Sequence, residues 1–237
     1  MNILNDSDYM LLRKLVSFNQ SQTKEFAANF LSKFYVSIVE TEDYIFAEGD
    51  IPIALVAHLD TYFEGDGIDR NFIYPYFDGI MSHPEGAGFD DKAGIFSIFK
   101  ILDQGYLPHV IFTTNEEVGS LGAKELVKDM PNHPFKELKY LIELDRENDY
   151  DCVFYGCKNK KFISYVESFG FVETFGTSSD INHICPVWKT AGVNLSIGYK
   201  HQHSKNEILN IEFMFNTISK VKEMLDDNIN VKGAFKY

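Results

Sequence analysis

Two adjacent carboxylates, Asp90 and Asp91, open an apolar stretch and are the first residues of this 237-residue sequence whose arrangement suggests chemistry. Three small residues precede them at positions 86–88, and such residues let a backbone approach another group closely. The apolar residues that follow include the spacing of a buried helical face: Ile95, Phe96, Ile98, Phe99, Ile101 and Leu102. One carboxylate at a helix start commonly caps free N–H groups. Two in succession also fit presentation of a carboxylate to a metal ion, so both interpretations stay open on this stretch alone.

Three other segments place His and carboxylate side chains at the ends of expected strands. Residues 51–57, 110–114 and 138–144 are almost continuously apolar, which is typical of strands buried on both faces of a mostly parallel sheet. Helices are expected between them, from residue 90 and over residues 120–128. Polar side chains follow the strands: His58 and Asp60, then Glu116 and Glu117, then Asp145. Because the ligand-binding crevice of an open α/β sheet lies beyond the carboxyl ends of its strands, we expect these clusters to meet, which favours a metal site over capping.

The remaining segments predict an α/β fold of three layers, with a mostly parallel central sheet and helices on both faces. Further helices are expected over residues 6–18, 21–35, 159–169 and 211–225, and in a short segment that contains His183. Further strands are expected as a hairpin of residues 36–40 and 44–48, and at 152–155, 171–175 and 192–198. The sequence has no internal repeat and no Pro/Gly/Ser-rich linker, so residues 1–237 are expected to form a single domain.

Residues 62–88 are predicted to form a long loop rich in glycine and aromatic residues. A loop of this length in a compact domain is more often functional than not, although a short strand near residues 71–74 is compatible with the sequence. Tyr74, Tyr76 and Phe77 are expected either to line a specificity pocket or to pack as an aromatic loop.

The composition excludes several classes of partner. Acidic residues outnumber basic ones by 35 to 22, giving a formal net charge of −13, whereas nucleic-acid binding needs clustered Lys and Arg. An acidic cleft instead favours metal ions and substrates with free amino groups. No apolar run reaches the ~20 residues of a membrane span, and the N-terminal residues do not have the pattern of a signal peptide. The three cysteines form no CxxC pair, so we expect a reducing compartment, the cytoplasm, and no membrane partner.

The His and carboxylate residues suffice for a site with two zinc ions. Zinc binds imidazole nitrogen and carboxylate oxygen, and two neighbouring ions need a carboxylate that bridges them. His58 and His203 offer one imidazole to each ion, Asp90 can bridge, and Glu117 and Asp145 can complete the two ligand sets.

Two more acidic residues have expected roles beside these ligands. Asp60 follows His58 by two residues and is placed to accept the N–H of that ring's other nitrogen, which would fix its tautomer. Glu116 precedes a candidate ligand and is free to act as the general base on a water molecule.

These residues lie in five ordered motifs that resemble those of the co-catalytic di-zinc exopeptidases. This clan includes peptidase T-like tripeptidases, acetylornithine deacetylase-like amidohydrolases and single-domain bacterial leucyl aminopeptidases. The motifs are His58-Leu59-Asp60-Thr61, Gly88-Phe89-Asp90-Asp91-Lys92-Ala93-Gly94, Glu116-Glu117-Val118-Gly119, Asp145, and His203-Ser204-Lys205-Asn206-Glu207. The resemblance implies a zinc-exopeptidase-like fold, and it implies that a cis peptide bond joins Asp90 to Asp91.

The same resemblance implies a distribution of ligands. His58, Asp90 and Asp145 would hold one zinc ion, and Asp90, Glu117 and His203 would hold the other, with Glu116 as the base. His201 competes with His203 for the last position, and His203 is preferred because Glu207 follows it by four residues, as in the clan. Ser179 and Asp180 resemble the polar turn that contacts substrate.

The sequence departs from the tripeptidase and deacylase branches in one respect. Those branches insert a lid domain of about a hundred residues after the segment equivalent to Asp145. Only 34 residues, positions 146 to 179, separate Asp145 from Asp180 here. The interval between His58 and Asp90 also leaves no room for the insert of the shell-forming aminopeptidases. We therefore expect the catalytic domain alone, without an inserted lid or dimerisation domain.

The function expected from these residues and the resemblance is hydrolysis of an amide bond. The leading hypothesis is an aminopeptidase or small-peptide exopeptidase with two Zn²⁺, or Co²⁺ or Mn²⁺ in their place, that uses a metal-bridging hydroxide and a proton relay through Glu116. One alternative is a deacylase of N-acyl amino acids. Another is a catalytically silent member that binds a peptide or a protein partner. The expected substrate is thus a peptide or an acylated amino acid, and the sequence leaves the oligomeric state open.

Overall fold

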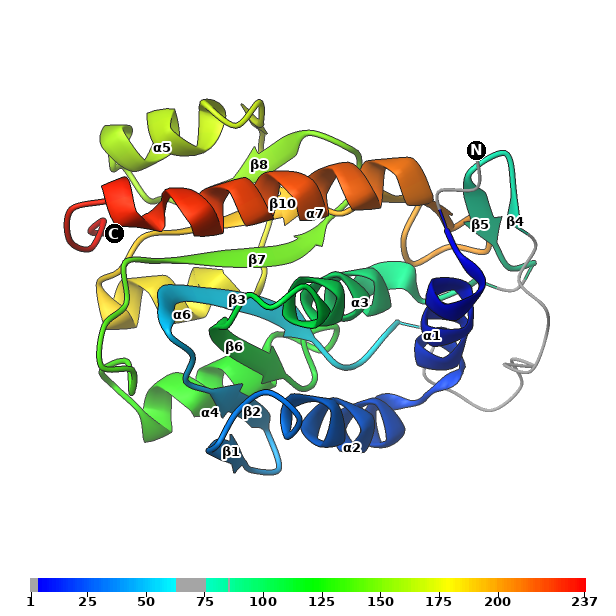
Figure 1. Cartoon of the computed structure of the whole chain (residues 1–237), viewed down its shortest axis with the longest axis horizontal. Helices are drawn as coiled ribbons and strands as arrows, with labels where there is room; N and C mark the ends of the chain where they lie inside the picture. Colours follow the sequence, from blue (N-terminus) through cyan, green and yellow to red (C-terminus); the bar gives the residue numbers. More distant parts are fainter. Residues whose placement is uncertain (1–3, 63–75, 85) are drawn as a thin grey trace.

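An eight-stranded sheet forms the centre of the molecule (Figure 1). The computed structural model describes residues 4–62, 76–84 and 86–237. Within them the strand order of this sheet is β1-β2-β6-β3-β7-β10-β8-β9. Its strands are β1 (Ile38–Glu40), β2 (Tyr44–Ala47), β3 (Ile51–His58), β6 (Pro108–Thr113), β7 (Tyr140–Arg146), β8 (Asp151–Val153), β9 (Val172–Glu173) and β10 (Gly192–Ser196).

The four inner strands run in the same direction. Strand β3 pairs in parallel with β6 and β7, and β7 pairs in parallel with β10. The edges are mixed: β1 and β2 form the predicted hairpin and β2 is antiparallel to β6, while β8 is antiparallel to β10 and parallel to β9. The predicted α/β fold with a mostly parallel sheet is confirmed.

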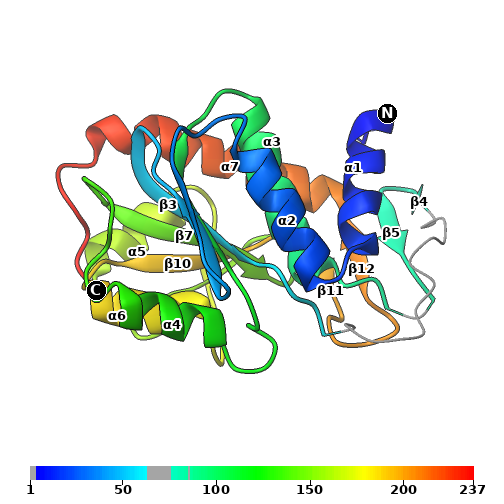
Figure 2. The ribbon, with the colours of Figure 1, turned by 90° about the horizontal axis from the view of Figure 1, so that it is seen from below.

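Helices cover both faces of the sheet (Figure 2). The larger core, on one face, takes side chains from α1 (Asp6–Ser17), α2 (Gln20–Leu31), α3 (Phe89–Asp103), α5 (Lys160–Glu167) and α7 (Ile211–Asp226). The smaller core, on the other face, takes them from α4 (Leu121–Asp129) and α6 (Asp180–Trp188). A short 3-10 helix, η1 (Asp227–Asn230), follows α7.

Strand β3 shows why the sheet is buried on both sides. Ile53, Leu55 and Ala57 belong to the larger core, whereas Ala54 and Val56 belong to the smaller one. Side chains alternate between the faces of a strand, so a continuous apolar run supplies two cores at once. Burial on both faces fixes the register of β3 and therefore the position of His58 at its end.

A second, four-stranded sheet was not predicted from the sequence. Its order is β11-β12-β5-β4, and all of its described pairs are antiparallel. The strands are β4 (Tyr76–Phe77), β5 (Ile80–Ser82), β11 (Tyr199–Lys200) and β12 (Ile208–Asn210). The pairing of β5 with β12 ties the segment before α3 to the segment that carries His203.

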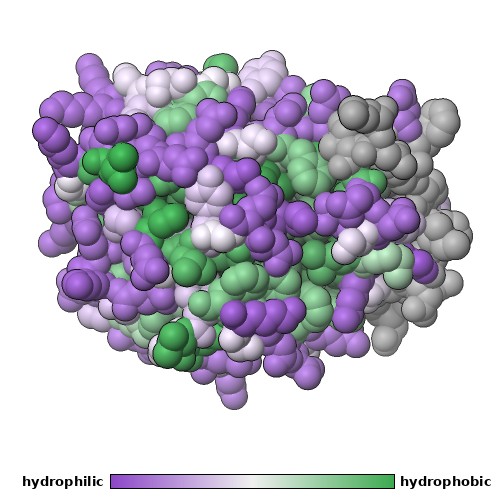
Figure 3. Space-filling model, viewed as in Figure 1, coloured by the Kyte–Doolittle hydropathy of each residue, from purple (hydrophilic) through white to green (hydrophobic). Residues whose placement is uncertain are grey.

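Two further predictions, one on the long loop and one on membrane spans, can be compared with the described residues only. The possible strand at residues 71–74, and Tyr74 with it, lie outside the described residues, and the side chains of Tyr76 and Phe77 are likewise not described. In the described part of the chain, no helix combines the length and the apolar character needed to cross a membrane. The face shown in Figure 3 is largely hydrophilic, with smaller hydrophobic groups between the polar side chains.

Candidate metal centre

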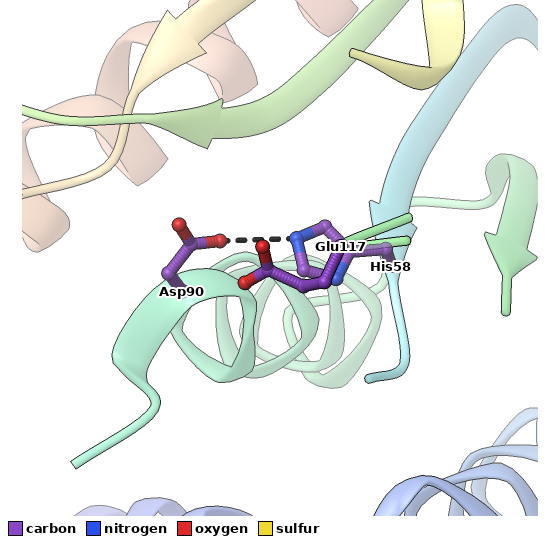
Figure 4. Close-up of side chains that lie close together, drawn as sticks. All are labelled: His58, Asp90 and Glu117. Carbon is purple, nitrogen blue, oxygen red and sulfur yellow. Dashed lines mark hydrogen bonds and ion pairs between the residues drawn. The ribbon is translucent and has the colours of Figure 1, made fainter. Parts of the chain in front are cut away.

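The polar clusters predicted at the strand ends meet at one edge of the sheet. His58 is the last residue of β3, Asp145 lies near the end of β7, and Glu116 and Glu117 follow β6. Strands β6, β3 and β7 are neighbours in the sheet, so their carboxyl ends lie side by side. Asp90 reaches the same place from the start of α3 (Figure 4).

His58 faces two of the predicted carboxylates. Its Nε2 lies 3.0 Å from Asp90 Oδ1 and 3.6 Å from Asp145 Oδ1. The imidazole is 1% exposed, and both carboxylates are also largely buried. Figure 4 shows the His58 ring directed toward Asp90, with Glu117 beside it.

His203 faces the other side of Asp90. Its Nε2 lies 3.3 Å from Asp90 Oδ2 and 2.9 Å from Glu117 Oε2. The two oxygens of Asp90 are therefore directed to two different histidines, as a bridging carboxylate requires. Within the described part of the chain, His201 has no hydrogen bond or ion pair to these residues and is exposed.

The backbone around Asp90 is held by buried hydrogen bonds. Glu207 accepts from the amides of Ala87 (3.1 Å), Gly88 (2.6 Å) and Asp90 (3.0 Å). The Asp90–Asp91 peptide bond is cis, as the resemblance implied, and both residues depart from helical dihedral angles. The carboxylate of Asp90 faces the two histidines, and within the described residues it does not cap an amide of α3.

The Asp91 carboxylate binds backbone amides next to the cluster. It accepts hydrogen bonds from the amides of His58 (3.2 Å) and Gly94 (3.0 Å). The Asp91 carboxylate, His58 and Asp145 also lie close enough together to form a second group that could hold a metal ion. Because both oxygens of Asp91 are already occupied by backbone amides, we assign it to positioning and keep Asp90 as the shared carboxylate.

Asp145 is held by two hydroxyl groups. Ser179 donates to its Oδ2 at 2.9 Å, and Tyr199 donates to its Oδ1 at 3.0 Å. Tyr199 was not predicted from the sequence, and it belongs to strand β11 of the small sheet. Ser179 is itself buried.

Asp180 is more deeply buried than expected for a residue in a turn that contacts substrate. It is fully buried, accepts a hydrogen bond from Thr113, and donates its amide to Glu143 Oε1 at 3.1 Å. Glu143 was missed because its position within an apolar strand resembles that of a core residue. The polar turn instead lines the cavity beside the cluster with Thr177 and Ser178. Substrate contact by Ser179 and Asp180 therefore stays a prediction.

Asp60 and Glu116 flank the cluster. Asp60 lies 3.3 Å from His58 Nδ1, and it accepts hydrogen bonds from the amides of Glu116 (3.0 Å) and Glu117 (3.1 Å). It thus connects the His58 ring to the loop after β6. The Glu116 carboxylate accepts from Ser120 Oγ at 3.2 Å and lines a cavity of about 130 Å³ with Asp90, Asp145 and His203.

The crowding of carboxylates shifts several pKa values. Burial raises the pKa of Glu116 to about 8, and the charges of Asp145, Asp180 and Asp90 add to this effect while His58 opposes it. Hydrogen bonds that the His203 ring donates to Asp90 and Glu117 raise the pKa of His203 to about 10. Burial opposes protonation of His58, but Asp145, Asp60 and Asp90 raise its pKa well above the ordinary value. The neighbouring carboxylates thus favour the protonated forms of both histidines.

The donor set fits a metal site. Atoms of His58, Asp90 and Glu117 lie within 4.8 Å of one another, and His203 contacts two of these residues. Imidazole nitrogens and carboxylate oxygens are the ligands of zinc in catalytic sites. Asp60 lies beside the His58 ring, and Ser179 and Tyr199 donate hydrogen bonds to Asp145, which are contacts of the kind that orient ligands in metal sites.

Comparisons by sequence find no match: no protein-family model and no curated protein matches this chain. Solved structures do match. The aminopeptidase PepT from Bacillus cereus aligns with a TM-score of 0.72 and 14% identity over 95% of this chain and 99% of its own. A tripeptidase from Staphylococcus aureus gives 0.72 and 13% over 97% and 100%, and a TET aminopeptidase from a marine Thaumarchaeota archaeon gives 0.70 and 13% over 93% and 97%. This chain therefore has the fold of these solved peptidases, in agreement with the co-catalytic zinc exopeptidase resemblance.

Proposed function

We propose that this protein is a di-zinc hydrolase that removes the N-terminal residue from a small peptide. The observation that carries this proposal is the placement of Asp90 between His58 and His203, with a further carboxylate beside each histidine. The peptidase fold of the structural neighbours supports it.

The proposed ligand sets are those implied by the sequence. His58, Asp90 and Asp145 would hold one zinc ion, and Asp90, Glu117 and His203 would hold the other; Co²⁺ and Mn²⁺ have compatible ligand preferences. When bound, the two ions would act as Lewis acids toward the scissile carbonyl and would lower the pKa of the attacking water. Asp60 would keep the His58 ring oriented through Nδ1.

Glu116 is the proposed general base. It lines the cavity beside three of the proposed ligands, and its backbone is fixed by Asp60. Burial and the neighbouring carboxylates raise its pKa to about 8, which lets Glu116 hold a proton at neutral pH. The positive charge of bound metal ions would lower this pKa and favour the ionised form that takes a proton from water. Glu116 would then deliver this proton to the leaving amine.

The cavity favours a substrate with a free amino group. Besides the proposed ligands Asp90 and Asp145, whose charge bound metal would offset, Glu116 and Glu147 line it, so its surroundings are acidic. This charge supports the aminopeptidase hypothesis over deacylation of N-acyl amino acids, in which the amino group is blocked. We further propose that residues 1–237 act as a single catalytic domain in the cytoplasm.

The test is hydrolysis of a panel of aminoacyl, tripeptide and N-acyl substrates by the zinc-loaded protein and by Glu116→Gln. We expect release of N-terminal residues by the wild type and a loss of at least about 100-fold in kcat in the variant, with its zinc content unchanged. Glu167→Gln, an exposed change at the end of α5, is the matched control and keeps full activity. Bound zinc without turnover of any substrate would contradict the proposal and favour a partner-binding role.

A further inference from the structure

The cavity beside the candidate metal centre is lined by one positively charged side chain, Arg146, that has no role in the proposed hydrolysis. Its described lining is mainly acidic or neutral and includes Glu147, Tyr155 and Ser178. Arg146 is the one Lys or Arg side chain among these lining residues. In the sequence, Arg146 lies between two acidic residues, the candidate ligand Asp145 and Glu147.

The Arg146 side chain has no protein partner in the described part of the chain. No carboxylate there lies within ion-pair distance of it, and its Nε is buried without a hydrogen-bond partner. The backbone is well held, because Arg146 pairs with Ser196 of β10 and its carbonyl accepts from Ile197 at 2.8 Å. A buried guanidinium donor without a partner is unfavourable, which indicates that a ligand supplies the missing acceptor.

The chemistry of the guanidinium defines that ligand. Its planar N–H groups match the two oxygens of a carboxylate and bind them bidentately. Arg146 lines the same cavity, of about 130 Å³, as Asp90, Glu116 and Asp145. A carboxylate bound by Arg146 in this cavity therefore lies close to the scissile bond. In a dipeptide only one carbon atom separates the scissile nitrogen from the free carboxylate.

We propose that Arg146 binds a substrate carboxylate and selects short peptides whose free α-carboxylate follows the scissile bond directly. This inference rests on the proposed hydrolytic function. An acidic side chain on the N-terminal residue would present the same chemical group, so the two sources must be separated by experiment.

The experiment compares kcat/KM for Leu-Leu, its C-terminal amide Leu-Leu-NH₂ and Glu-Leu-NH₂ in the wild type and in Arg146→Gln. We expect the wild type to prefer Leu-Leu over its amide by about 10- to 100-fold, and this ratio to fall to near one in the variant. Arg146→Lys keeps the charge without the bidentate geometry, so it should retain only part of the preference. Lys161→Gln removes an exposed charge on α5 and leaves the ratio as in the wild type.

The outcomes distinguish the two sources of the carboxylate, and they separate this inference from the proposed hydrolytic function. If the wild type prefers Glu-Leu-NH₂ over Leu-Leu-NH₂ and this preference disappears in Arg146→Gln, the carboxylate that Arg146 binds belongs to the N-terminal side chain. Equal turnover of Leu-Leu and both amides by the wild type, or an unchanged ratio in the variant, would overturn the inference and leave the hydrolytic function intact.

Binding of a product provides a readout that does not need turnover. Calorimetry with L-leucine and leucinamide should show about 10-fold weaker leucine binding in Arg146→Gln at equal zinc content. Equal leucine binding by wild type and variant would overturn the role of Arg146 even if no substrate were hydrolysed. A wild type that binds leucine in this way but cleaves nothing would contradict only the proposed function.

Discussion

At the scale of single residues, Asp90 is the centre of the site. Its two oxygens face His58 and His203, which reach it from opposite ends of the sequence. Burial alone would raise the pKa of Asp90, but hydrogen bonds from His203 and His58 lower it. The carboxylate is therefore ionised and shared between two protonated histidines when no metal is bound.

This arrangement predicts that zinc binding releases protons. Each histidine must lose its proton to become a ligand, and their pKa values are raised, to about 10 for His203. Raising the pH removes this competition, so the apparent zinc affinity should increase from pH 6 to pH 8 by about tenfold per unit for each proton displaced. Calorimetry in buffers of different ionisation enthalpy measures the release. Affinity that is independent of pH, with no protons released, would contradict the assignment of the histidines.

A hydroxyl group beside Asp145 predicts a second effect. Tyr199→Phe removes the 3.0 Å hydrogen bond to Oδ1 of this candidate ligand and changes little else, because the ring stays in the core. We expect zinc affinity to fall by about 10- to 100-fold, as for other residues that orient ligands. Competition with a chelator measures the affinity. Tyr106→Phe is the control, since its hydroxyl binds Asp226 on the surface, and an effect equal to that of the control would show that Tyr199 does not support the site.

At the scale of elements, the site depends on how α3 begins. Three backbone amides of the segment before and at its start donate to one buried carboxylate, Glu207, which follows the loop carrying His203. The small sheet brings these segments together through β5 and β12. The position of Asp90 is thus set by residues more than a hundred positions away.

Glu207→Ala should therefore destabilise the protein by about 2 to 4 kcal/mol, because it leaves buried N–H groups without an acceptor. Chemical denaturation of the metal-free protein measures this loss in the free energy of unfolding. Glu167→Ala, an exposed change at the end of α5, should stay within about 0.5 kcal/mol of the wild type. If the two variants had equal stability, Glu207 would not hold the start of α3.

At the scale of the whole molecule, the sequence predicts the large sheet well and the small sheet not at all. Continuous apolar runs such as β3 are visible because burial on both faces leaves no polar alternation. The strands of the small sheet have only two or three residues, and their partners are remote in sequence, so no local pattern marks them. The same limit explains why Tyr199 was missed, whereas Glu143 was missed because it lies within an apolar strand of the large sheet. His58, Asp90 and Glu117 were recognisable as candidates because they lie in motifs.

The measurement that tests the central claim most directly is the zinc stoichiometry of the purified protein and of two ligand variants. We expect about two zinc ions per chain in the wild type, about one in His203→Ala, and fewer than one in Asp90→Ala, because Asp90 belongs to both proposed ligand sets. Glu116→Gln should retain both ions. Two ions retained in Asp90→Ala, or no zinc in the wild type after zinc is supplied, would contradict a centre that shares Asp90 between two metals.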